Sequence, residues 1–219
     1  MARFSGSGIS LDKGETVAVQ TTSGEVINNF HIGLGWDIHS GMDADLDAYV
    51  LQVGPNNTLI DLIYYGSLKS KDGAIQHTGD NLTGEGEGDD EVINIDLKKL
   101  NVNTEKLIVA VTIYRANLTF ADVENAFVRL VNAYDETEFI RYDLSNEAGR
   151  NYTMHMAEIF KKPDGNWDFT AIGRGTTHES IREFTNSVVS NPVGTASRNS
   201  SNNTTNNGGM FGRIKRFFN

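Results

Sequence analysis

Three aspartates at every second position are the first residues in this sequence that could do chemistry. They stand in the segment DADLDA as Asp43, Asp45 and Asp47. On a β-strand, side chains two residues apart leave the same face about 7 Å apart, so the three carboxylates could share cations. An EF-hand loop starting at Asp43 is excluded, because its sixth position would be Ala48 instead of glycine and its twelfth Gly54 instead of glutamate. A metal site here would lie at the edge of a β-sandwich.

The second acidic segment, residues 79–91, reads GDNLTGEGEGDDE. Like charges about 4 Å apart repel by up to ~4 kcal/mol per pair near a protein surface, so a compact arrangement of its carboxylates needs a cation or wide separation. Its glycines let backbone carbonyls turn inward as additional ligands, and a set of about six to eight oxygens suits Ca²⁺ better than Zn²⁺ or Cu²⁺. Mg²⁺ stays open, although its strict octahedral geometry fits less well. A solvated acidic turn without metal is the plain alternative.

Together with GLGWD at residues 33–37, these segments resemble the signature of the TerD family of tellurium-resistance and stress-response proteins. The resemblance extends from about Ser10 to about Val189. It implies a β-sandwich that binds two adjacent Ca²⁺ ions, a cytoplasmic bacterial or phage origin, and no established catalytic activity. The ligands that it implies are the side chains of Asp43, Asp45, Asp47, Asn81, Asp89, Asp90 and Glu91 and the carbonyls of Thr83 and Gly86, with Asp37, Asp80, Glu85 and Glu87 as further candidates.

We therefore expect a non-enzymatic calcium-binding stress-response protein, in which two Ca²⁺ ions stabilise an acidic loop edge that serves as an interaction surface. Its partners would be other stress-response proteins, which the sequence does not identify. The chain has no cysteine, which removes thiolate nucleophiles, disulfides and cysteine-based metal sites. A net charge of −10 argues against nucleic acid as the main partner, because phosphate binding needs a basic surface. A hydrolase built on paired carboxylates is a weaker alternative.

The histidines and tryptophans have simpler expected roles. The five histidines are scattered without paired metal spacing, so we expect surface or structural roles for them. His39 and His77 flank the acidic segments and could contact metal ligands. Trp36 and Trp167 each lie in an alternating pattern, which favours the core over a sugar-binding surface.

The elements that position these residues are mostly strands. Apolar residues alternate with small or polar ones from Phe30 to Trp36, which predicts a strand that runs directly into Asp37. Apolar or alternating runs separated by Gly, Asn and Asp turns predict further strands at residues 45–53, 58–64, 106–115, 126–133, 138–144, 152–160 and 166–172.

Helix is sparse in this pattern. Thr119 is a candidate N-cap with Asp122 three residues later, and apolar residues recur at helical spacing from Ile181 to Val188. Many evenly spaced strands with little helix predict an all-β sandwich or barrel. With the TerD resemblance, the expected fold is a two-sheet β-sandwich with a few short helices and a disordered C-terminal tail.

The composition changes near residue 190. We expect one TerD-like domain over residues 1–189, a flexible polar linker over 190–209 and a basic, aromatic segment over 210–219. That last segment could weakly contact an anionic membrane, so the alternative function is a Ca²⁺-dependent membrane-binding module whose bound ions bridge to lipid phosphates, as C2 domains do. The N-terminus has no run of signal-peptide character, and no apolar run reaches the roughly 20 residues of a membrane span, so the expected location is the cytoplasm.

Overall fold

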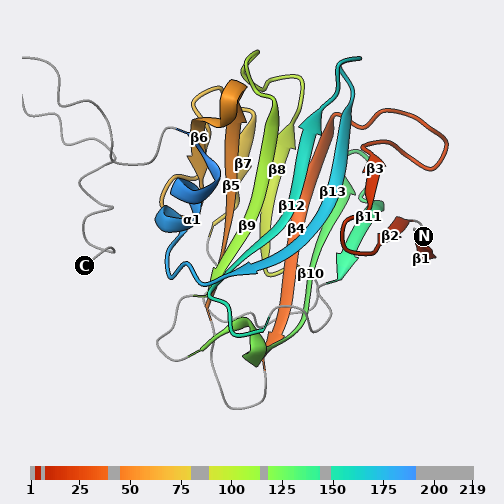
Figure 1. Ribbon diagram of the computed structural model, residues 1–219. Helices are drawn as coiled ribbons and strands as arrows, with labels where there is room; N and C mark the ends of the chain where they lie inside the picture. Colours follow the sequence, from red (N-terminus) through yellow and green to blue (C-terminus); the bar gives the residue numbers. More distant parts are fainter. Residues whose placement is uncertain are drawn as a thin grey trace, which may run out of the picture.

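The chain forms two β-sheets packed face to face (Figure 1). The computed structural model describes residues 3–5, 8–38, 45–79, 89–113, 118–143 and 149–190. The strands in this part of the chain are β1 (Arg3–Ser5), β2 (Gly8–Leu11), β3 (Thr16–Ala18), β4 (Asn29–Ile38), β5 (Leu46–Gly54), β6 (Thr58–Ile63), β7 (Ile75–His77), β8 (Glu91–Asp96), β9 (Lys106–Ile113), β10 (Val123–Asn132), β11 (Glu138–Asp143), β12 (Thr153–Lys161) and β13 (Trp167–Thr176). There are also three short helical segments among the described residues: η1 (Pro55–Asn57) and η2 (Phe120–Asp122) connect strands, and α1 (Ile181–Val188) follows β13.

The strand order places β4 and β5 in different sheets. The seven-stranded sheet has the order β1-β2-β11-β10-β4-β8-β7, and the six-stranded sheet has the order β3-β13-β12-β9-β5-β6. Neighbouring strands are antiparallel except β2 and β11, which are parallel. The prediction of an all-β, two-sheet sandwich is confirmed.

The main core fills the space between the two sheets, because alternate residues of each strand point inward. Ile32 and Leu34 of β4 meet Ala48 and Val50 of β5 in this core, and each is at most 1% exposed. Both tryptophans are buried in it, as the sequence predicts. Burial of these positions therefore determines which residues of β4 and β5 face the core, and so how the neighbouring acidic residues are placed.

A smaller hydrophobic cluster lies on the outer face of the six-stranded sheet, under α1. Phe184 and Ile181 of α1 pack there against Tyr49, Leu51 and Ile108 of β5 and β9. Two helical turns alone are too short to be stable in water, so this packing holds α1 in place. In the part of the chain that the structure describes, no helix has the length and apolarity needed to cross a membrane.

The predicted strands and helical segments are present in the structure, but the structure contains additional short strands. Each predicted strand corresponds to an observed one, and Thr119 and Asp122 form the expected capping box at the start of η2. The strands β1, β2, β3, β7 and β8 were not predicted, because most of them are only three or four residues long. The predicted linker and basic segment lie outside the described residues, apart from Ser190.

Candidate metal site

The two acidic segments meet at one end of the sandwich. Asp45 directly precedes β5 in the six-stranded sheet, and Glu91 is the first residue of β8 in the seven-stranded sheet. The amide of Ala48 donates a hydrogen bond to Glu91 Oε2, with 2.6 Å between nitrogen and oxygen. This bond crosses from one sheet to the other, so it joins the start of β5 to the end of the second acidic segment.

Glu91 is a buried carboxylate that points into the sandwich. The residue is 1% exposed, and its Oε2 also lies 3.5 Å from His77 Nε2 of β7. Pairing of β5 with β6 ends at Val50, so Ala48 lies beyond the end of β6 and its amide bonds to a side chain. A buried carboxylate needs such donors, because leaving water without compensation is costly. The sequence had marked His77 as a neighbour of the acidic segment, and the structure places it against Glu91.

Asp90 attaches the same segment to β4. Its amide donates to the carbonyl of Leu34 at 2.8 Å, and its Oδ2 accepts from the amide of Trp36 at 2.9 Å. These bonds continue the pairing of β4 with β8 beyond the first residue of β8. The backbone and one carboxylate oxygen of Asp90 are therefore fixed at the end of the sheet.

Asp47 lies on the other side of β5 from Glu91. Asp47 is 4% exposed and lies on the same face of β5 as Tyr49, which is the face toward α1. Ala48, between them, faces the main core. The hydroxyl of Tyr49 donates to Asp47 Oδ2 at 3.4 Å. Burial, followed by the negative charge of Asp47, raises the pKa of Tyr49 well above its usual range, so the phenol stays a donor. Asp47 and Glu91 approach β5 from opposite faces.

Asp89 points to the outer face of the seven-stranded sheet. Both of its carboxylate oxygens accept hydrogen bonds from Arg129 of β10. The three consecutive acids therefore take different directions: Asp89 outward to a guanidinium, Asp90 along the edge of β4, and Glu91 inward. No sequence signal indicated Arg129, which is separated from Asp89 by 40 residues.

Part of the predicted ligand set lies outside the described residues. This holds for Asp43, Asn81, Thr83 and Gly86, for the further candidates Asp80, Glu85 and Glu87, and for the side chain of Asp37. Among the described residues, no three His, Asp or Glu side chains form a group that could hold a metal ion by themselves. A metal at this end of the sandwich would need both the described carboxylates and ligands from residues 41–44 or 80–88.

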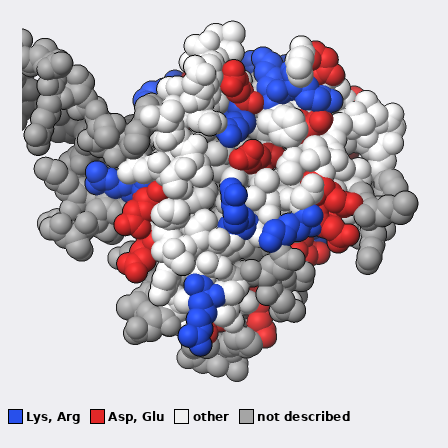
Figure 2. Space-filling view, viewed as in Figure 1, with Lys and Arg blue, Asp and Glu red and all other residues white. Residues whose placement is uncertain are grey.

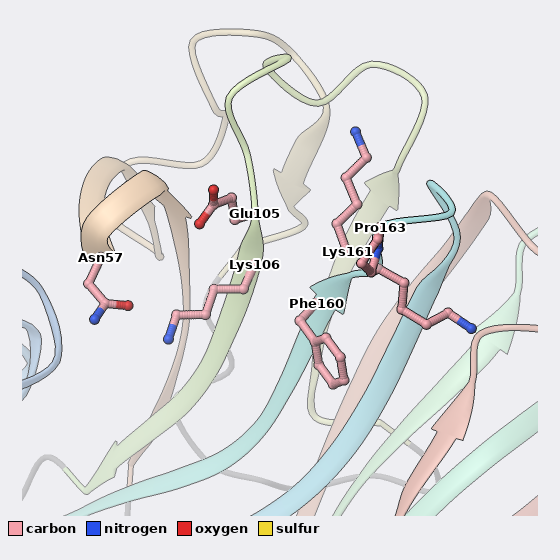
Figure 3. A pocket seen from close by; sticks show the side chains of 7 residues that line it. Asn57, Glu105, Lys106, Phe160, Lys161 and Pro163 are labelled. Atoms are coloured by element: carbon pink, nitrogen blue, oxygen red, sulfur yellow. The ribbon is translucent and has the colours of Figure 1, made fainter.

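A hollow of about 480 Å³ lies at the opposite end of the sandwich (Figure 3). Its lining residues are Asn57, Glu105, Lys106, Phe160, Lys161, Lys162 and Pro163. Two of its lysines are paired with carboxylates: Lys162 Nζ lies 3.0 Å from Asp168 Oδ1, and Lys106 Nζ lies 3.8 Å from Glu158 Oε1. The ammonium of Lys161 points away from the hollow. The face of the six-stranded sheet likewise carries acidic and basic side chains interspersed (Figure 2). The hollow does not bring reactive groups together, so the acidic end is the better candidate.

His155 is a buried histidine beneath α1, on β12 of the six-stranded sheet. It is 1% exposed, and its ring meets that of Phe184 edge to face at 5.6 Å between centroids. Burial, then the positive charges of Arg174 and Lys106, lower the pKa of His155 from 6.5 to about 4, although Glu158 lies 3.4 Å from its Nε2. The folded protein therefore keeps this imidazole neutral at pH 7.

We expect His155 to make the protein less stable in acid. Since its folded pKa lies below the unfolded value, the unfolded chain takes up a proton first, and stability present above pH 6.5 is lost as the pH falls towards 4. The loss should reach about 3 kcal/mol, to be measured by urea unfolding of the native protein and His155→Gln from pH 7 to pH 4.5. The difference between the two should shrink with acid; an unchanged difference would contradict the assignment. His31→Gln, on the partly exposed face of β4, is the matched control.

The comparison with known proteins decides the family. Residues 7–187 match the family model of the TerD domain. The chain belongs to the TerD family. Tellurium resistance protein TerD of Alcaligenes sp. is 41% identical over 175 residues, which are 76% of this chain and 90% of that protein. Stress response protein SCP2 of Bacillus subtilis (strain 168) is 37% identical over 201 residues, which are 83% of this chain and 99% of that protein.

A solved TerD homologue has the same fold. The telluride resistance protein homologue from Streptomyces coelicolor A3(2) superimposes with a TM-score of 0.62 over 73% of this chain and 95% of that chain, at 24% identity. At this identity the likeness supports the fold alone. The resemblance seen in the sequence is thus confirmed, and the TerD family to which this chain belongs comprises tellurium-resistance and stress-response proteins.

Proposed function

We propose that this TerD-family protein is a non-enzymatic, cytoplasmic, Ca²⁺-binding stress-response protein. Two adjacent Ca²⁺ ions would stabilise the acidic end of the sandwich as a surface for other stress-response proteins. The observation that carries the proposal is the hydrogen bond from Ala48 to Glu91, which brings both acidic segments to one end of the fold. Without it, each segment could be read as a separate solvated turn.

The chemistry of the described donors fits calcium. Asp45, Asp47, Asp90 and Glu91 offer only carboxylate oxygens, which are the hard ligands that Ca²⁺ prefers. Asp47 and Glu91 are almost fully buried, and like charges taken out of water are unfavourable unless donors or a cation compensate them. Asp43, Asn81, Thr83 and Gly86 would complete the ligand sets.

Three of these carboxylates, those of Asp47, Asp90 and Glu91, also hold other parts of the fold in place. Glu91 connects β8 to β5, and Asp90 connects the second acidic segment to β4. Asp47 accepts a hydrogen bond from Tyr49, which belongs to the smaller hydrophobic cluster under α1. A bound ion would supply positive charge that links segments from both sheets. Rigid loops at this end would then present a defined surface to a partner, since less conformational entropy is lost when a preorganised surface binds.

Calorimetric titration with Ca²⁺ and with Mg²⁺, combined with melting curves, tests the proposal. We expect a saturable heat with Ca²⁺ and a weaker one with Mg²⁺. At a free Ca²⁺ concentration of 100 times the dissociation constant, stability should rise by about 2.7 kcal/mol, which corresponds to roughly 5–10 °C in Tm for a chain of this size. The absence of both heat and stabilisation would reject calcium binding.

A further inference from the structure

The outer face of β4 carries a gap in its row of side chains at Gly33. In the sheet, Gly33 lies directly opposite Arg129 of β10 on one side and Val92 of β8 on the other. A Cβ placed on Gly33 would overlap the carboxylate of Asp89. Glycine at this position therefore makes the room in which Asp89 lies flat on the strand.

Arg129 binds Asp89 with a fork of two hydrogen bonds. Nε lies 2.7 Å from Oδ1, and Nη2 lies 3.1 Å from Oδ2. The Asp89 side chain is only 7% exposed, so this pair is much less screened than a surface ion pair. Hydrogen bonding to Asp89 is the main cause that raises the pKa of the Arg129 guanidinium.

Neighbouring side chains hold Arg129 in this position. Its Nη1 donates to Glu138 Oε2 at 3.2 Å, and Arg141 Nη1 donates to the same oxygen at 3.4 Å. Arg141 also donates to Asp143 and stacks on the ring of Phe127, 4.0 Å from its centroid. The guanidinium that receives Asp89 is thus part of a network on β10 and β11, which do not contain either acidic segment.

We propose that Arg129 is a positioning residue for the acidic end, and that Asp89 serves as the anchor of the second acidic segment instead of as a metal ligand. A guanidinium that donates to both oxygens of a carboxylate offsets its negative charge and repels a divalent cation, which makes that carboxylate a poor metal ligand. With Asp89 fixed on the outer face, the next two residues can only run along β4 and into the sandwich, where Asp90 and Glu91 are found. This proposal differs from the ligand role that the family resemblance implies for Asp89, and it rests on the proposed calcium site.

A double-mutant cycle tests the anchor in two independent ways. The variants are Asp89→Asn, Arg129→Gln and the double variant, with Arg150→Gln on the exposed surface as the matched loss of one positive charge. With chelator present, each single variant should lower Tm by roughly 3–10 °C, and the double variant should be no worse than the worse single one. Additive losses would overturn the anchor, and this readout needs no calcium.

Calcium affinity provides the second readout. Each single variant should weaken Ca²⁺ binding by about 10-fold or more, as for other residues that orient ligands, and Asp89→Asn should cost nothing further in the Arg129→Gln background. If adding Asp89→Asn to Arg129→Gln lowers Ca²⁺ affinity by the same factor as in the native background, Asp89 is a ligand. If Arg129→Gln binds Ca²⁺ more tightly than the native protein, Arg129 competes with the ion for Asp89. Either result overturns the proposal. If the native protein binds no calcium, the proposed function fails, and the Tm cycle alone decides on the anchor.

Two milder variants keep the test valid if Arg129→Gln does not fold. Gly33→Ala removes no charge and should displace Asp89 through its Cβ, so it should reproduce the effects of Asp89→Asn. Arg129→Lys keeps the charge but loses the fork, and should fall between the native protein and Arg129→Gln in both Tm and Ca²⁺ affinity. Native behaviour of Gly33→Ala would contradict the placement of Asp89.

Discussion

Replacing both Asp45 and Asp47 by asparagine is expected to weaken Ca²⁺ binding at the proposed site by about 100-fold or more. Both residues lie at the start of β5, next to the amide of Ala48 that holds Glu91. Carboxylates supply most of the attraction for Ca²⁺, and an amide oxygen of the same size keeps the shape but removes the charge. A 100-fold loss corresponds to about 2.7 kcal/mol, which calorimetry resolves easily.

The matched control for this pair is Glu25→Gln with Glu136→Gln. It removes the same formal charge from two exposed turns, neither of which lies in an acidic segment. We expect this control to bind calcium within about twofold of the native protein, because exposed charges more than a Debye length away are largely screened. Equal losses in both double variants would mean that overall negative charge, and not a site at β5, attracts the ion.

Phe184→Ala will destabilise the protein by about 3–5 kcal/mol. Phe184 is 1% exposed and fills the cluster between α1 and the outer face of the six-stranded sheet. Its ring also contacts the rings of His155 and His178, with centroids 5.6 and 6.4 Å away. Truncating a buried phenylalanine removes this apolar burial and leaves a cavity, and a helix of two turns depends on such packing for its stability. Urea unfolding monitored by circular dichroism would measure the loss.

Ser187→Ala in the same helix is the control for Phe184. Ser187 is exposed, and alanine is the better helix former, so its effect should stay within about 0.5 kcal/mol. Calcium affinity should change little with Ser187→Ala, because this exposed side chain contacts none of the proposed ligands in the described part of the chain. A loss below about 1 kcal/mol for Phe184→Ala would show that α1 is not docked as the structure places it.

The sequence was most informative where local pattern alone decides structure. The alternation from Phe30 to Trp36 specified a half-buried strand, because one face must meet a core. The helical spacing from Ile181 to Phe184 specified α1 for the same reason. Neither pattern states which sheet a strand joins, so the order that separates β4 from β5 could not be predicted.

The candidate site shows the same limit at the scale of single residues. Asp89, Asp90 and Glu91 read as three similar ligands, yet their directions depend on the register of β8 against β4. The sequence does not predict a role for Arg129, because arginines are common on exposed strand faces. Its role depends on the pairing with Gly33, which leaves room for the carboxylate of Asp89. Long-range pairing, which no local pattern encodes, decides which of these acids points into the sandwich and which faces a guanidinium.

Amide chemical shifts of the full chain during a Ca²⁺ titration test whether both acidic segments contribute to one calcium site. The amide of Ala48 follows the first acidic segment directly and donates to Glu91 of the second, while the amide of Trp36 donates to Asp90, so the two amides report on two separate contacts of the acidic end. We expect saturable shifts at both amides with one midpoint, and little change at Lys106 and Phe160 at the opposite end. Absence of saturable shifts at Ala48 and Trp36, or larger shifts at Lys106 and Phe160, would contradict a calcium site built from both segments.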